Sequence, residues 1–60
     1  MENEFIDRNV NELDSLMGSV MYFILRKDYD SVICCLEDMQ DITGNKLIPA
    51  LEELLYSESP

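Results

Sequence analysis

The residues of this chain that could do chemistry are two neighbouring cysteines and two pairs of adjacent carboxylates: Cys34 and Cys35, Glu37 and Asp38, and Glu52 and Glu53. Adjacent residues of a helix point about 100° apart, so the two cysteines cannot form a disulfide with one another without breaking a helix. Two thiolates without a histidine or a second cysteine pair also fall short of a closed zinc site. The cysteines therefore predict a reduced, cytoplasmic protein without a bound metal.

Catalysis has little support in the residue types. The chain has no histidine, the commonest proton carrier near neutral pH, and its only two glycines, Gly18 and Gly44, do not form a phosphate-binding loop. A carboxylate pair acts as acid and base only in a cleft that shifts its pKa, and a chain of 60 residues is too short to build a deep cleft. No acidic stretch has the spacing of a calcium loop. We expect neither enzyme activity nor a cofactor.

The charge balance limits the class of partner. Thirteen Asp and Glu residues stand against four Lys and Arg residues, for a net charge of −9. Lys and Arg make the phosphate contacts that attach proteins to nucleic acids and anionic membranes, so neither direct nucleic-acid binding nor membrane binding is expected. The most apolar window, Leu16 to Leu25, is much shorter than the roughly 20 residues that cross a bilayer. Acids occupy the N-terminus, where a secretory leader would carry lysines.

Apolar periodicity predicts an all-α fold whose first element is a long helix over residues 3–26. The spacing of its main apolar seam alternates between four and three residues, which is typical of packed helices. This seam comprises Ile6, Val10, Leu13, Met17, Val20 and Ile24. A second apolar set lies beside it: Phe5, Leu16 and Phe23. With Met21 and Leu25, the apolar arc covers about 200° of the helix, about twice the stripe of an ordinary surface helix.

Two shorter helices, over residues 29–43 and 46–56, are predicted to follow as a helical hairpin, and residues 57–60 are predicted to be a frayed tail. The chain is then one small domain of three helices.

Capping residues support these boundaries. Asp28 or Asp30 suits the N-cap of the first short helix, and Gly44 suits the C′ position after it. Asn45 can cap the last helix, and Pro49 lies in the first turn, where a missing N–H matters little.

The predicted hairpin is too short to cover the whole apolar arc of the first helix. Each buried Leu or Phe contributes roughly 1.5–3 kcal/mol, which exceeds the contribution of most surface salt bridges. We therefore expect a symmetric homodimer that completes a helical bundle. The residues expected at its interface are Phe5, Leu13, Leu16, Met17, Val20 and Phe23. A monomeric three-helix bundle and an obligate complex with another protein remain the alternatives.

These features favour a protein that acts by contact with a protein partner, as a regulator, inhibitor or adaptor. The contact is expected through an acidic helical face or through the leftover apolar face of the first helix. A bacteriophage or mobile-element origin is the expectation for so small and acidic a chain. One alternative is imitation of DNA, in which outward acids occupy the basic groove of a nucleic-acid-binding protein. The residues of this acidic face are Asp30, Glu37, Asp38, Asp41, Glu52 and Glu53. A further alternative is a structural subunit of a helical assembly.

The methionines allow a more specific interpretation. Met17, Met21 and Met39 could line an adaptable groove for a partner, because methionine is flexible and polarizable. Methionines at helical spacing more often belong to an ordinary core, and the sequence alone leaves both alternatives open.

Overall fold

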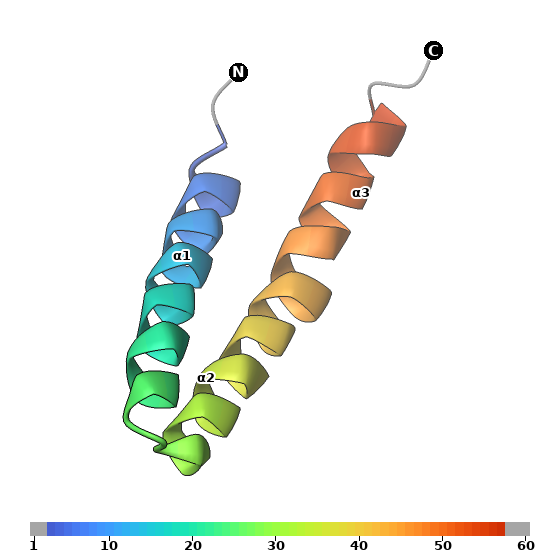
Figure 1. Ribbon diagram of the computed structural model, residues 1–60. Helices are drawn as coiled ribbons and strands as arrows, with labels where there is room; N and C mark the ends of the chain where they lie inside the picture. The colour runs from blue at the N-terminus through green and yellow to red at the C-terminus, as the bar shows by residue number, and fades with distance from the viewer. Residues whose placement is uncertain (1–2, 58–60) are drawn as a thin grey trace.

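The computed structural model describes residues 3–57 as an antiparallel pair of helices joined by a tight turn (Figure 1). The first helix, α1, spans Glu4–Leu25. The second is continuous and has three parts: α2 (Tyr29–Asp41), a π-helical segment η1 (Ile42–Leu47) and α3 (Ile48–Ser57). The molecule is a rod of 49 × 18 × 13 Å. The all-α prediction is confirmed for the described residues, whereas the three-helix arrangement is wrong because α2 and α3 are parts of one helix.

The start of α1 is set by a side-chain cap. Asn3 has an extended backbone, and its Oδ1 accepts a hydrogen bond of 3.2 Å from the N–H of Ile6. This bond satisfies one of the N–H groups that a first helical turn leaves without a partner. Glu4 and Asp7 lie in the first turn, where negative charge complements the helix dipole.

The turn after α1 is a complete Schellman motif. The N–H of Lys27 donates to the carbonyl of Ile24, and the N–H of Asp28 donates to the carbonyl of Phe23, both at 3.0 Å. This geometry requires a left-handed residue at the C′ position. Lys27 takes that conformation, with φ of 60°, although it is not a glycine.

Asp28 begins the second helix. Its carboxylate accepts hydrogen bonds from the Ser31 N–H at 3.3 Å and from the Ser31 hydroxyl at 2.8 Å. Of the two candidate caps, Asp28 and Asp30, the structure therefore uses Asp28.

The predicted break between residues 43 and 46 is wrong. Gly44 does not have a positive φ, so it does not act as a helix-ending C′ glycine. The Asn45 side chain does not cap a new helix either, because its amide donates to Asp41 Oδ1 at 2.6 Å. Instead the backbone widens into η1, where the N–H of Ile48 bonds to the carbonyl of Thr43, five residues back. The helix then continues to Ser57; the rest of the predicted frayed tail, residues 58–60, lies outside the described residues.

Two features of the sequence explain why the helix widens at this point. Pro49 cannot donate a backbone hydrogen bond, and in a regular helix its ring clashes with the carbonyl four residues back. In addition, a regular helix would place Lys46, four residues after Ile42, toward α1. The extra residue of the π-turn places Leu47 there instead, so Ile42 and Leu47 are only 3% and 7% exposed, while Lys46 lies beside this contact and remains exposed.

The contact between the two helices forms a narrow core. The least exposed core residues of α1 are Ile6, Asn9, Leu13, Leu16, Val20 and Phe23. Those of the second helix are Val32, Cys35, Met39, Ile42, Leu47 and Ala50. Within residues 3–57, four hydrophobic residues are buried: Val20, Val32, Ile42 and Leu47. Among the described residues, no side chain is completely buried.

The predicted seam of α1 is therefore only half right. Ile6, Leu13 and Val20 face the second helix as expected. Val10, Met17 and Ile24, the other half of that seam, are exposed, and the positions just before them (Asn9, Leu16 and Phe23) take their place. A single neighbouring helix covers one strip of a helix surface, and the arc of α1 carries two strips that share Ile6, Leu13 and Val20.

Candidate interaction surface

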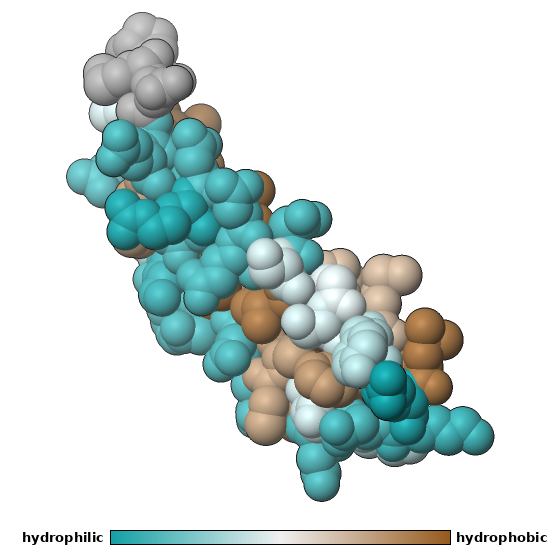
Figure 2. Space-filling model, turned by 90° about the vertical axis from the view of Figure 1, so that its left-hand side faces the viewer, coloured by the Kyte–Doolittle hydropathy of each residue, from teal (hydrophilic) through white to brown (hydrophobic). Residues whose placement is uncertain are grey.

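The strip of α1 that the second helix leaves uncovered is apolar. Val10, Met17 and Ile24 repeat every seven residues along it, and Met21 lies one turn from the last two. All four are exposed. Figure 2 shows the molecule from the α1 side: hydrophobic side chains gather along one edge and toward the α1–α2 turn, and hydrophilic side chains cover most of the remaining surface.

The second helix adds an apolar strip on the same side of the pair. Leu36 follows the core residue Cys35 by one position, as Met17 follows Leu16 on α1. In an antiparallel pair, positions that flank the core in the same sense on both helices meet on one side. A groove lined by Val10, Leu13, Asp14, Met17 and Met39 lies between the two strips. We call this side the apolar face: Val10, Met17, Met21, Ile24, Tyr29, Ile33, Leu36, Ile48, Leu51 and Leu55.

The opposite side of the helix pair is polar. The described positions that flank the core there are mostly polar (Glu12, Ser19, Ser31, Asp38, Lys46 and Glu53), and Phe5 is the hydrophobic exception. The Ser19 hydroxyl bonds to the carbonyl of Ser15 at 3.3 Å, and Ser31 is held by Asp28. The rod is thus amphipathic across its width, and most of the exposed large hydrophobic side chains of the described residues lie on one of its two long sides.

The six residues of the predicted acidic face are all exposed. Because the second helix is continuous, these residues lie along one helix rather than on two helices of a hairpin. Asp30, Glu37 and Glu52 lie farthest from α1, and Asp41 lies on the same outer surface, beside η1.

The predicted interface residues divide into two groups. Val20 is buried, and Leu13, Leu16 and Phe23 are half-buried, all within the contact between the two helices of one chain. Met17 lies on the apolar face, and Phe5 is 45% exposed near the N-terminal end of α1. The apolar spacing of the sequence predicts Val10 and Ile24 in the core, because the strongest heptad pattern contains them. The pattern that the structure uses contains the polar Asn9, so it is the weaker apolar pattern in the sequence.

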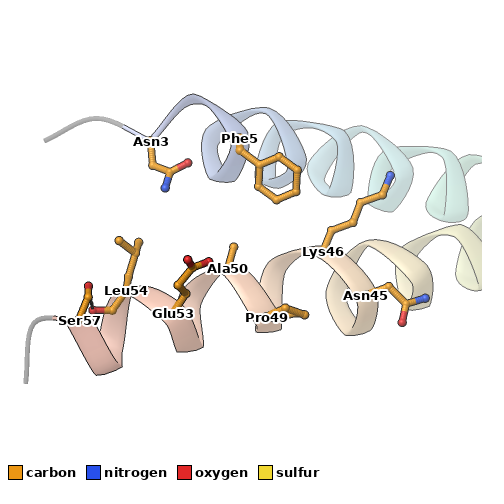
Figure 3. A pocket seen from close by; sticks show the side chains of 9 residues that line it. All are labelled: Asn3, Phe5, Asn45, Lys46, Pro49, Ala50, Glu53, Leu54 and Ser57. Carbon is orange, nitrogen blue, oxygen red and sulfur yellow. Dashed lines mark hydrogen bonds between the residues drawn. The ribbon is translucent and has the colours of Figure 1, made fainter.

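A cleft lies between α1 and α3, toward the end of the rod opposite the turn (Figure 3). Figure 3 shows Phe5 from α1 and Lys46 from η1 pointing into it, with Leu54 near its outer end. Glu53 also lines it. The lining mixes aliphatic, aromatic and oppositely charged groups without converging on one point.

Chemical sites are not evident in the described part of the chain. Cys34 is exposed, Cys35 is half-buried, and both are free thiols. Residues 3–57 contain no group of three or more Cys, Asp or Glu side chains placed to hold a metal ion. None of the described helices combines the length and apolarity needed to cross a membrane. Comparison with protein-family models, curated proteins and solved structures finds no match to this chain.

Proposed function

We propose that this protein acts by protein–protein contact through its apolar face, as a regulator, inhibitor or adaptor. The observation that carries the proposal is the extent of that face. Ten large hydrophobic side chains, each 48–64% exposed, lie on one side of the rod, whereas the described part of the chain buries four hydrophobic residues. Monomeric soluble proteins rarely leave a continuous apolar surface of that extent in water, and such surfaces mark interaction sites.

The energetics of the helix pair support the same conclusion. Two helices with so few buried side chains have little burial to set against the conformational entropy lost on folding, and small scaffolds of this kind usually add further contacts. A second copy of the chain is the simplest source of them when no other partner is present. In a symmetric dimer the same face of both copies is covered, which gives a helical bundle. We therefore propose a homodimer for the isolated protein.

One pair of variants tests this role of the face. Met17→Glu places a charge at its centre, while Ser15→Glu adds the same charge at an exposed position outside it. In sedimentation equilibrium, we expect the unmodified protein and Ser15→Glu to form dimers of the 7.0 kDa chain in a concentration-dependent manner, and Met17→Glu to shift toward monomer. A stable helical monomer for all three proteins would contradict the dimer, and a much larger mass would favour a structural assembly.

Imitation of DNA is the second candidate, and the continuity of the second helix favours it. Asp30, Glu37 and Glu52 are displayed along one rod, as phosphates are along a nucleic acid. Replacement of these three residues by Asn or Gln would weaken binding to a basic nucleic-acid-binding protein and reduce the salt dependence of that binding. Met17→Glu would leave it unchanged, which separates this mode of binding from contact through the apolar face.

A further inference from the structure

We propose that the partner that fits the apolar face is a basic amphipathic helix of another protein, which binds in place of a second copy of this chain. This inference rests on the proposed function, because it specifies what the apolar face binds. Three observations carry it: the sign of the charges along both edges of the face, the location of the four basic residues, and the groove between the helices.

Acidic side chains border the face along α1. Asp14 lines the groove together with Val10 and Met17. Asp7 lies three residues before Val10, on the same surface of the helix. A partner that packs against Val10 and Met17 therefore meets negative charge at its margin.

The edge of the apolar face along the second helix is negatively charged as well. Asp30 and Glu37 lie within one turn of Ile33, and Glu52 lies within one turn of Ile48 and Leu55. All three acids are exposed. The apolar face is thus bordered by carboxylates on both long sides.

The basic residues lie elsewhere. Arg8 is one turn from Glu12, on the polar side of the rod, and Lys46 lines the cleft between α1 and α3. The Arg26 guanidinium stacks 4.6 Å from the centre of the Tyr22 ring. Lys27 is in the turn. A second copy would consequently place acids against acids, whereas a helix with flanking Lys and Arg would satisfy both edges.

The shape of the face fits one helix. The groove between α1 and α2 is lined by Val10, Leu13, Met17 and Met39, so a side chain of a third helix can pack between the first two. Methionine adjusts to differently shaped side chains. The uncovered strip of α1 from Val10 to Ile24 is roughly 21 Å long at 1.5 Å per residue, which corresponds to about four helical turns of a partner.

Synthetic peptides test the charge and the apolar pattern separately. The first has leucines at helical spacing and lysines elsewhere, the second replaces every lysine by glutamate, and the third has the composition of the first in scrambled order. Each carries one tryptophan within the leucine pattern. This chain has no tryptophan, so the emission of the peptide reports its burial without background. We expect the first peptide to bind about tenfold or more tightly than the other two, with a blue shift, and to convert dimers into 1:1 complexes.

Matched variants locate the binding site. Asp14→Asn with Glu37→Gln removes two charges from the edges of the face, and Glu12→Gln with Asp38→Asn removes two charges from the polar side. The first pair should weaken binding of the leucine–lysine peptide severalfold more than the second pair. Met17→Glu should abolish the blue shift.

Several outcomes would overturn the inference. If the scrambled peptide binds as tightly as the first peptide, net charge alone accounts for binding. If the leucine–glutamate peptide binds as tightly as the first peptide, the acidic edges do not contribute to binding. Failure of all three peptides to bind, with self-association that Met17→Glu abolishes, would identify a second copy as the occupant and leave the proposed function intact. If Met17→Glu changes neither peptide binding nor mass, both proposals fail.

Discussion

Among the described non-glycine residues, Lys27 alone has a positive φ, which is the conformation that glycine adopts most readily. It has φ of 60° in the Schellman turn, and its N–H is held by the carbonyl of Ile24. The left-handed conformation brings the Cβ atom of an L-residue close to backbone oxygen, which glycine avoids. The turn is retained because its two backbone hydrogen bonds and the Asp28 cap connect the helices over a very short distance.

Lys27→Gly should therefore stabilise the turn between α1 and α2, and with it the fold of the chain. We expect the free energy of unfolding to rise by about 1 kcal/mol relative to Lys27→Ala, and the thermal midpoint measured by circular dichroism to rise with it. Lys27→Ala is the matched control because it loses the same charge and keeps Cβ. Equal midpoints for the two variants would show that the turn relaxes without strain.

Asn9 shows how a single residue can mislead a prediction. It is 6% exposed in the contact between the helices, and its amide donates to the Phe5 carbonyl at 2.8 Å. This bond within its own helix makes burial of the side chain tolerable. A polar residue at a core position favours one register over others and lowers stability. A search for uninterrupted apolar spacing consequently rejects the strip that contains Asn9.

At the scale of the elements, the π-turn of η1 reconciles a proline with an apolar register. Deletion of Gly44 would place Leu47 four residues after Ile42 and keep the core positions in a regular α-helix. Such a helix would then bring the Pro49 ring against the carbonyl four residues back, which costs about 3 kcal/mol.

The deletion should thus be stabilising only when combined with Pro49→Ala. We expect deletion of Gly44 alone to lower the thermal midpoint, and the combined variant to exceed both the unmodified protein and Pro49→Ala, with stronger ellipticity at 222 nm. If deletion of Gly44 alone stabilises the protein, the spacing between Ile42 and Leu47 accounts for the π-turn and Pro49 does not.

At the scale of the whole molecule, self-repulsion opposes folding. A net charge of −9 is carried by a rod of 7.0 kDa, and the acids of the described residues are exposed. At high ionic strength the interactions between charges become short-ranged, because the Debye length is about 3 Å at 1 M salt. Salt should therefore weaken the repulsion between carboxylates both within one chain and between two copies.

We expect the thermal midpoint to rise by several degrees between low salt and about 1 M sodium chloride. Glu37→Lys with Glu52→Lys lowers the net negative charge and should reduce the slope of the midpoint against salt. A midpoint that falls as salt is added would instead show that attractive ion pairs dominate the electrostatic energy.

Local signals predicted much of the helical content and, in Asp28, one of the two candidate N-caps for the second helix; they did not predict the Schellman turn at Lys27. The acidic first turn of α1 and the Asp28 cap follow from residues within one turn of each other. The apolar arc of α1 predicted more apolar surface than the rest of the chain covers, but the exposed Val10, Met17 and Ile24 belong to the seam that was expected to be covered. The residues expected at a dimer interface were less predictable, because four of the six belong to the contact within one chain.

By itself the sequence determined that the chain is helical, strongly acidic and more apolar along its first half than a single partner helix can cover. Only the tertiary structure decided which half of the arc faces inward and whether the chain breaks near Gly44. Helix-ending signals such as Gly44 and Asn45 contribute about 1 kcal/mol each, whereas burial of Ile42 and Leu47 against α1 contributes more and requires one continuous helix. Packing between distant segments therefore outweighed local preference.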